Sequence, residues 1–168
     1  DGSAATTEDF VNSISKGAFS INETCPFDID QFQNWYYKAG TPRVIINQEW
    51  DPKKSTLNIS FEQKISSDLD NNNSEMVIPV LYSCYKSEKE FDPIFEDNLF
   101  ILDKQKKQLK LKDSSFRHKP PILSIFRGFS APVIWESDLS TNDYLFLFLN
   151  DNDYFTRWDS GQILMLKI

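Results

Sequence analysis

Histidine and cysteine, which supply most zinc ligands and many nucleophiles, are almost absent from this sequence. Its 168 residues include 1 histidine and 2 cysteines. A zinc site of the His-Glu-x-x-His type needs two histidines, so this chain cannot form one by itself. His118 lies between charged residues and is expected at the surface. Cys25 and Cys84 have no neighbouring histidine and no metal-ligand spacing, so we expect reduced thiols in a cytoplasmic protein.

Long apolar runs and an excess of basic charge are also missing. No run of about 18 apolar residues is present, so no membrane span is predicted, and no signal peptide is recognisable. The net charge of −7 argues against a nucleic-acid partner, because phosphate contacts need clustered Lys and Arg. The basic residues gather in one stretch, which we interpret as the charged edge strand of a sheet. This stretch contains Lys104, Lys106, Lys107, Lys110 and Lys112.

Motifs for nucleophilic, phosphate and calcium chemistry are absent too. No serine lies in a Gly-x-Ser-x-Gly turn, and Gly128 is a single glycine rather than part of a phosphate-binding loop. Asp151 and Asp153 resemble the start of a calcium loop, but Tyr154 and Phe155 follow where an oxygen ligand and a glycine are needed. We therefore interpret this acidic stretch as a helix N-terminal cap. No catalytic, cofactor-binding or metal-binding residue is predicted in this chain.

Helical periodicity marks the first part of the chain, residues 1–41. Thr6 and Asp9 have the spacing of a capping box at the start of one apolar stripe. A second stripe at helical spacing consists of Ile29, Phe32, Trp35 and Tyr36. Gly40 is expected to cap this second helix in a left-handed conformation, and Pro42 prevents its continuation.

Short β-favouring runs separated by turn residues fill residues 42–136. The runs are Val44–Trp50, Leu57–Lys64, Glu75–Tyr85, Leu99–Asp103, Gln108–Lys112, Ile122–Phe126 and Val133–Trp135. About seven short strands with no helix between them predict a mainly β fold, an antiparallel Ig-like β-sandwich flanked by helices at both ends.

Helical patterns return in residues 137–168. Ser140 and Asp143 have N-capping spacing before a segment, Tyr144–Leu149, that is apolar on every side. Helices with this pattern belong inside a larger helical layer. We therefore expect an exposed apolar surface here, and self-association of the chain in isolation.

Three stretches of the chain together resemble the zinc-dependent aminopeptidase N family of gluzincin metallopeptidases. They are DGSAATTEDFV at residues 1–11, FDIDQFQNWYYKAGTPRV at residues 27–44, and PPILSIFRGFSAPV at residues 120–133 followed by DNDYFTRWDSGQ at residues 151–162. The pair W-Y-x-x-A-G-T-P and R-G-F-S-A-P-V is far more specific than either motif alone. In order and spacing the resemblance covers nearly the whole chain.

The resemblance implies a fragment of a larger enzyme. Residues 1–41 would be the helical tail of the catalytic domain, 42–136 the β-sandwich domain, and 137–168 the first helices of the C-terminal helical domain. The implied partners are these neighbouring domains, and Trp35, Tyr36, Phe129 and Trp158 are expected to pack between domains. The implied parent removes N-terminal residues from peptides with zinc, whereas the zinc-binding and catalytic motifs of the family are absent from this chain.

The implied role is a non-catalytic spacer that positions the C-terminal helical domain over the active site. One alternative is a free-standing β-sandwich that serves as a binding or adhesion module. A second is a self-sufficient hydrolase. The coding sequence upstream tests the first alternative, because the spacer requires a His-Glu-x-x-His motif there and the binding module does not. An assay of the chain itself tests the second.

Overall fold

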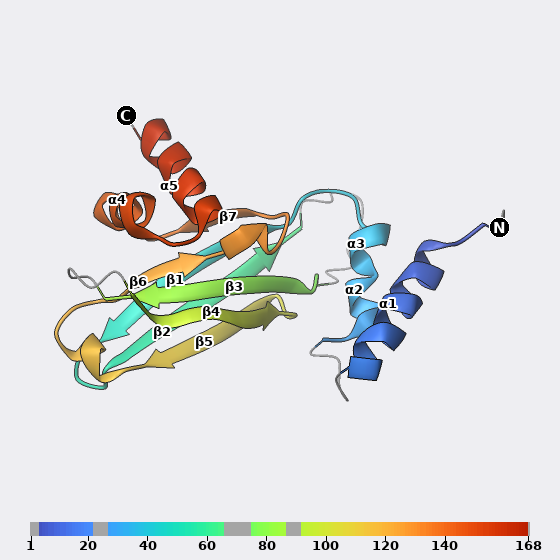
Figure 1. Ribbon diagram of the computed structural model, residues 1–168, viewed down its shortest axis with the longest axis horizontal. Coiled ribbons are helices and arrows are strands. Elements are labelled where there is room, and N and C mark those ends of the chain that lie inside the picture. The colour runs from blue at the N-terminus through green and yellow to red at the C-terminus, as the bar shows by residue number, and fades with distance from the viewer. Residues whose placement is uncertain (1–3, 22–26, 66–74, 87–91, 168) are drawn as a thin grey trace.

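The structure, a computed structural model, describes residues 4–21, 27–65, 75–86 and 92–167. Its centre is a pair of β-sheets that pack face to face (Figure 1). The larger sheet has the order β5-β2-β1-β7 and the smaller sheet the order β4-β3-β6. The strands are β1 (Arg43–Asp51), β2 (Thr56–Lys64), β3 (Ile78–Tyr85), β4 (Pro93–Leu102), β5 (Lys106–Lys112), β6 (Ile122–Ile125) and β7 (Ile134–Ser137). The predicted mainly β, Ig-like sandwich with helices at both ends is confirmed.

The described strands pair antiparallel with one exception. β7 runs parallel to β1, with Val44 opposite Trp135. β5 forms an edge of the larger sheet, as its lysines predict. β4 begins at Pro93, earlier than the predicted start at Leu99, because Pro93 and the exposed residues 96–98 break up the β-favouring pattern around Ile94 and Phe95, which pack partly against the core.

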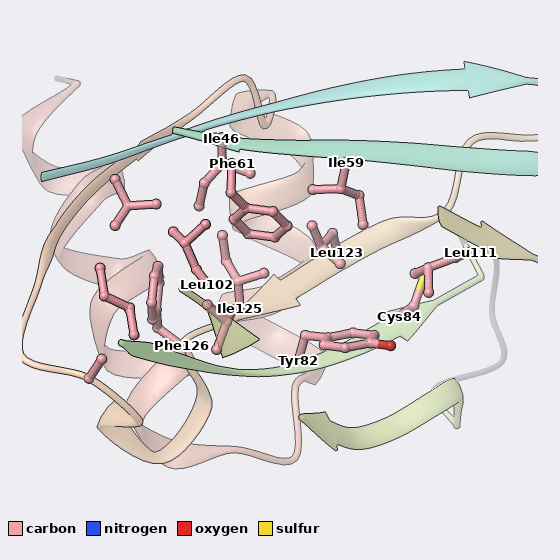
Figure 2. Close-up of a cluster of buried hydrophobic side chains, with 14 of the residues drawn as sticks. Ile46, Ile59, Phe61, Tyr82, Cys84, Leu102, Leu111, Leu123, Ile125 and Phe126 are labelled. Carbon is pink, nitrogen blue, oxygen red and sulfur yellow. The ribbon is translucent and has the colours of Figure 1, made fainter. Parts of the chain in front are cut away.

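Alternation of side chains along β1 and β2 builds the core between the sheets. The buried positions of these two strands include Val44, Ile46, Leu57, Ile59 and Phe61. Ile46 lies opposite Phe61 in the antiparallel register. Figure 2 shows Ile46, Ile59 and Phe61 facing Leu123 and Ile125 from the other sheet. A slip of one residue would turn this set outward, so burial fixes the register.

The N-terminal helices lie beyond one end of the sandwich (Figure 1). They are α1 (Thr7–Ile21), α2 (Ile29–Phe32) and α3 (Asn34–Tyr37). Thr6 and Asp9 form the predicted reciprocal cap, with hydrogen bonds of 3.0 and 3.2 Å. The second stripe was predicted as one helix, but the helix is interrupted at Gln33. Gly40 has the expected positive φ of 100°. However, α3 ends at Tyr37, and the residue that caps it is Lys38 in an extended conformation. The prediction that Gly40 caps the helix is therefore wrong.

The C-terminal helices α4 (Thr141–Asn150) and α5 (Tyr154–Leu166) form a hairpin near β6 and β7 (Figure 1). Ser140 and Asp143 make a complete capping box. Tyr144 and Leu147 of α4 are buried in a second, smaller core together with Tyr85, Ile122 and Leu139. No helix in the described part of the chain is long and apolar enough to cross a membrane.

Candidate functional site

A buried arginine joins the sandwich to the α4–α5 hairpin. Arg127 lies in the short 3-10 helix η2 (Arg127–Phe129), directly after β6, and its side chain is 3% exposed. Its Nη1 donates to Oδ1 of Asp151, between α4 and α5, at 2.6 Å. Its Nε donates to Oδ1 of Asp97 in β4 at 2.7 Å, and its Nη2 donates to Oδ1 of Asn152. One guanidinium group therefore contacts both the smaller sheet and the turn that connects the two helices.

Neutral hydroxyl groups extend this Arg127 network into both layers. Tyr85 Oη donates to Oδ1 of Asp151 at 3.0 Å. Ser124 Oγ accepts from Arg127 at 3.2 Å and donates to Oγ1 of Thr156 in α5 at 3.3 Å. Burial, and then the charge of Asp151, raise the pKa of Tyr85 to about 12. The phenol therefore stays a neutral hydrogen-bond donor at physiological pH.

The charges in the network depend on each other. Burial by itself would lower the pKa of Arg127, but the hydrogen bond to Asp97 and the charge of Asp151 outweigh it and raise this pKa. Asp151 is 2% exposed, and among the described residues its Oδ2 has no hydrogen-bond partner. Removing one charge of a buried pair leaves the other without compensation, which costs about 3–5 kcal/mol. The network therefore holds the helix hairpin in one position with a large penalty for separation.

The acidic stretch was predicted to be an N-terminal cap, and this holds for one aspartate only. The side chain of Asp153 caps α5 by accepting from the backbone N of Thr156 at 2.8 Å. It also accepts from the backbone N of Gly128 at 3.1 Å. Asp151 is not the N-cap of α5, because it lies two residues before Asp153 at the end of α4; its Oδ1 accepts from Arg127 and from the backbone N of Asp153 at 2.8 Å. The prediction was therefore wrong for Asp151.

The loop after β6 holds residues in the left-handed region, which costs about 1–2 kcal/mol for each non-glycine residue. Phe126, Gly128 and Phe129 have φ values of 54°, 58° and 56°. The conformation of Phe129 places its ring 5.2 Å from that of Phe155 in α5. Trp158 lies 5.8 Å from Phe155 on the other side of the cluster. The loop thus brings two predicted interdomain residues, Phe129 and Trp158, to one surface.

An open, mostly apolar groove of about 570 Å³ lies beside these rings, between β7 and α5. Its lining includes Phe129, Ile134, Trp135, Phe155, Trp158 and Asp159. Phe129 and Trp158 are 55% and 58% exposed. Burial raises the pKa of Asp159, the acidic residue of the groove. The groove therefore presents large apolar side chains and one poorly solvated carboxyl group.

Hydrogen bonds from neutral side chains attach α2 and α3 to the opposite part of the sandwich. Trp35 packs against the main core, and its Nε1 donates to the carbonyl of Val77 at 2.8 Å. Asn34 donates to the carbonyl of Glu75 at 3.0 Å, and Gln31 donates to that of Asp103 at 2.6 Å. These bonds satisfy backbone carbonyl groups just before the start of β3 and just after the end of β4. Trp35 therefore faces the sandwich of its own chain.

The outer side of these helices is exposed. Tyr36 is 43% exposed, and its ring packs edge-on against Phe32 at 6.4 Å. Tyr37 donates from Oη to the carboxylate of Glu8 in α1. Phe10 and Ile14 of α1 are each 55% exposed. Trp35 and Tyr36 are thus neighbours in sequence that point to different surroundings.

The described residues offer no arrangement for metal chemistry. They contain no group of three or more His, Cys, Asp or Glu side chains that could hold a metal ion. His118 is exposed, as predicted. Cys84 is fully buried, and this burial raises the pKa of its thiol. Cys25 lies outside the described residues.

The sequence reasoning did not find the Arg127 network. Arg127 is the only charged residue in the stretch from Pro120 to Val133, which is otherwise rich in apolar residues. A single charge in an apolar stretch is expected to be buried and to need a counter-ion. This pattern in the sequence could have indicated that Arg127 has a buried acidic partner. Its partners Asp97 and Asp151 lie 30 and 24 positions away in the sequence.

Comparison with known proteins adds the family. The model of a family described as "Domain of unknown function (DUF3458) Ig-like fold" matches residues 40–138. The chain belongs to this family. The matched residues contain all seven described strands, and they include Arg127 and the loop that presents Phe129.

Curated relatives of this DUF3458 member are named aminopeptidase N. The chain is 28% identical to the protein of Haemophilus influenzae over 172 residues, which cover 99% of the chain and 19% of the relative. It is 26% identical to the Escherichia coli protein and 31% identical to the Caulobacter vibrioides protein, with 98% of the chain and 18% of each relative covered. The chain spans about a fifth of the length of these relatives.

A solved structure agrees with this relationship. The crystal structure of Legionella pneumophila aminopeptidase A in complex with aspartic acid matches with a TM-score of 0.78 and 26% identity, covering 98% of this chain and 17% of that one. The resemblance to the aminopeptidase N family, drawn from the motifs, is confirmed. The chain corresponds along nearly its whole length to one part of an aminopeptidase N-like protein.

Proposed function

We propose that this chain is a non-catalytic spacer region of a zinc-dependent metallo-aminopeptidase. Its proposed parts are the tail of a catalytic domain (residues 1–41), the Ig-like sandwich (42–136) and the first helices of a C-terminal helical domain (137–168). The sandwich would position that helical domain over the active site. The observation that carries the proposal is the buried Arg127 network, which fixes the α4–α5 hairpin on the sandwich beside an exposed apolar groove.

A spacer must hold its neighbouring domains in a fixed relative position, and the Arg127 network is suited to this. Its contacts reach β3, β4, β6 and two residues of the turn between α4 and α5, Asp151 and Asn152. A buried, hydrogen-bonded ion pair has strict geometry, so the helices cannot slide on the sheet without breaking it. Apolar packing alone tolerates such sliding better, because it is not directional. The strained conformation of Phe129 would serve the same end by presenting its ring to a neighbouring domain.

The exposed apolar side chains at both ends support contacts with further domains. At the N-terminal end they are Phe10, Ile14, Tyr36 and Tyr37. At the C-terminal end they include Leu145, Phe148, Leu149, Trp158, Met165 and Leu166. Apolar side chains exposed together on a protein surface are typical of interaction sites. Interdomain packing of Trp35, Tyr36, Phe129 and Trp158 is part of this proposal, and Trp35 would pack between residues 1–41 and the sandwich through its contact with Val77. Self-association of the chain in isolation stays a prediction, measurable by light scattering.

Zinc would belong to the catalytic domain and not to this chain. One histidine and no suitable cluster among the described residues do not fit the three protein ligands and open position of a catalytic zinc site. We therefore derive no catalytic step from the residues of this chain. The substrates of the parent would be peptides with a free N-terminus. The cytoplasmic location stays a prediction.

The first test compares two proteins from the same gene. One is the 168-residue chain, and the other is the longer product that includes the upstream coding sequence. Both are assayed with an aminoacyl anilide and added zinc. The longer protein is expected to carry His-Glu-x-x-His and to release the anilide, whereas the chain is expected to be inactive. Turnover by the chain comparable to that of the longer protein, or an upstream sequence without the motif, would contradict the proposal and favour the hydrolase or the free-standing binding module.

The second test addresses the proposed interdomain residues. The double variant Phe129→Ser with Trp158→Ser is made in the chain and in the longer protein. In the chain alone it should cost little stability, because both side chains are more than half exposed. In the longer protein it should increase proteolysis between domains. An equal effect in the two proteins would show that these rings serve only the chain itself. The matched control is Tyr154→Ser, a residue of the same helix that is 83% exposed and lies outside the groove.

A further inference from the structure

The turn between β1 and β2 and the last residues of β5 lie at the end of the sandwich farthest from α1–α3 (Figure 1, lower left), and they line a basic pocket. It is formed by the turn between β1 and β2, the last residues of β5 and the short helix η1 (Ser114–Arg117). Its volume is about 530 Å³. The basic residues that line it are Lys53, Lys54, Lys110, Lys112 and Arg117. Five cationic side chains thus meet at one pocket of a protein whose net charge is −7.

Strand register explains why these charges converge. Lys112 lies opposite Thr56 in the β2–β5 pairing, and Lys110 lies opposite Asn58. Residues two apart in a strand point to the same face, so both lysines project from the outer face of the sheet. The turn after β1 adds Lys53 and Lys54 to that face. Protection of the sheet edge by the lysines of β5 does not require that basic side chains gather at one end of the strand.

Most of the positive charge in the pocket is not neutralised. Lys54 makes an ion pair with Asp51 at 3.2 Å. No ion pair is described for Lys53, Lys110, Lys112 or Arg117 within the described ranges of the chain. The lining contains one acidic residue, Asp113. Its Oδ1 accepts hydrogen bonds from the backbone N of Ser115 at 2.8 Å and from the Oγ of Ser115 at 2.6 Å. Like charges held together in this way favour the binding of an anion.

A buried hydroxyl group provides an independent observation. Thr56 lines the pocket and is 2% exposed. Its Oγ1 has no hydrogen-bond partner among the residues that the structure describes. Buried polar groups are almost always paired, so an unpaired hydroxyl calls for an explanation such as a ligand. A hydroxyl can donate to an anionic oxygen, and Ser55 and Ser114 in the same lining offer two further hydroxyl groups.

We propose that this basic pocket binds a small molecule that carries a diphosphate group. Phosphate-type groups combine several acceptor oxygens with more than one negative charge, which matches a set of hydroxyl donors and four cations that have no ion pair with the described residues. A single carboxylate would leave most of the cations unpaired. The pocket volume lies within the range of small-molecule sites, about 300–1,000 Å³, and exceeds what one phosphate group fills. The proposal is independent of the aminopeptidase role, because the pocket shares no lining residue with the groove and contains no member of the Arg127 network.

Calorimetric titration of the complete chain tests the proposal, with inorganic pyrophosphate as the probe and potassium chloride at matched ionic strength as the reference. We expect saturable 1:1 binding with a Kd of about 1 mM or lower. A second titration uses a nucleoside diphosphate. Tighter binding of the nucleoside diphosphate would indicate an organic ester as the ligand, and equal or weaker binding would indicate the free anion. Absence of saturable binding in both titrations would overturn the proposal.

Variants separate a specific site from general electrostatic attraction. Lys110→Ala with Lys112→Ala should weaken pyrophosphate binding at least about tenfold, because it removes two direct charge-assisted contacts. The matched control, Lys104→Ala with Lys106→Ala, removes the same charge near the other end of β5 and should change the Kd by less than about twofold. Equal losses in the two variants would overturn the proposal.

Thr56→Val tests the role of the hydroxyl and avoids the risk of misfolding. The side chains have nearly the same shape, and loss of an unpaired buried hydroxyl should not lower stability. Pyrophosphate binding should become several-fold weaker, while the thermal midpoint of the free chain stays the same or rises. Unchanged affinity together with an unchanged or higher midpoint would show that the hydroxyl does not meet the anion, and would contradict the proposed geometry.

Discussion

The two junctions of this molecule are built from different chemistry. At the N-terminal junction, Gln31, Asn34 and Trp35 donate neutral hydrogen bonds to backbone carbonyls at the end of the sandwich. At the C-terminal junction, Arg127 and Asp151 form a buried ion pair among hydroxyl and amide groups. Each neutral bond contributes about 0.5–1.5 kcal/mol and can be lost singly. The charged junction fails as a unit, because each charge needs the other.

This difference bears on what each junction can do. A set of separate neutral bonds anchors a segment but allows local adjustment. A buried ion pair adds little net stability compared with well-packed apolar residues, yet it strongly penalises every arrangement in which the charges separate. The C-terminal junction is therefore suited to fixing an angle between the sandwich and the helices, and the N-terminal junction to attachment.

The largest effect is expected from Arg127→Met. This change leaves the carboxylate of Asp151 buried without its counter-ion, so the free energy of unfolding should fall by about 3–5 kcal/mol. Urea denaturation followed by circular dichroism measures it. Asp151→Asn in the Arg127→Met background should restore part of the loss, because it removes the unpaired charge. Failure of that rescue would contradict the ion-pair explanation.

The matched control for the arginine is Arg43→Met. Arg43 pairs with Glu136 at 3.4 Å, but both side chains are more than half exposed. Exposed ion pairs contribute about 0–1 kcal/mol, so this change should barely move the denaturation midpoint. Similar losses for Arg43→Met and Arg127→Met would remove the distinction between buried and exposed charge on which the comparison rests.

A smaller effect is expected at the N-terminal junction from Trp35→Phe. The variant keeps an aromatic ring against the core but removes the hydrogen bond from Nε1 to the carbonyl of Val77. We expect a loss of about 1–2 kcal/mol, measured by the same denaturation. Amide exchange should quicken in α2 and α3 and not in α4 and α5. A loss as large as that of Arg127→Met would show that the junctions do not differ as described.

The smallest effect concerns pH and the carboxyl group of Asp159. Burial raises the native pKa of Asp159 above its ordinary value of 3.8. At pH values between 3.8 and this native pKa, the native state therefore binds more protons than the unfolded state. Stability from this group is therefore present at low pH and is lost as pH rises through the native pKa. Asp159→Asn should stabilise the chain relative to the parent at pH 7 but not at pH 3, as measured by thermal denaturation. Asp92→Asn, at an exposed position, serves as the control. A constant difference between the two pH values would contradict the burial effect.

Local sequence signals predicted most of the fold. β-favouring runs located the seven strands, and capping spacings located the starts of α1 and α4. The lysines of β5 indicated a sheet edge. These features depend on neighbours in sequence, which is why they could be read directly. The first half of β4 was missed, because only Ile94 and Phe95 in it pack against the core, between Pro93 and the exposed residues 96–98.

The candidate site depended on contacts that sequence spacing does not encode. Nothing within a few residues of Arg127 indicates that Asp97 and Asp151 are its partners, because the fold alone brings them together. The same holds for Trp35 and Tyr36: both lie in α3, and only the placement of α3 against the sandwich decides that Trp35 donates to Val77 while Tyr36 stays exposed. The parallel placement of β7 beside β1 is likewise a property of the whole sheet.

Residual dipolar couplings of backbone amides test the central claim most directly, that the Arg127 network fixes the α4–α5 hairpin on the sandwich. Couplings from β1–β6 and from α4 and α5 are measured in one weakly aligned sample of the chain. We predict that a single alignment tensor fits both sets, and that Arg127→Met requires separate tensors of different magnitude. A need for separate tensors in the unaltered chain would show that the helices move independently, and would contradict the account.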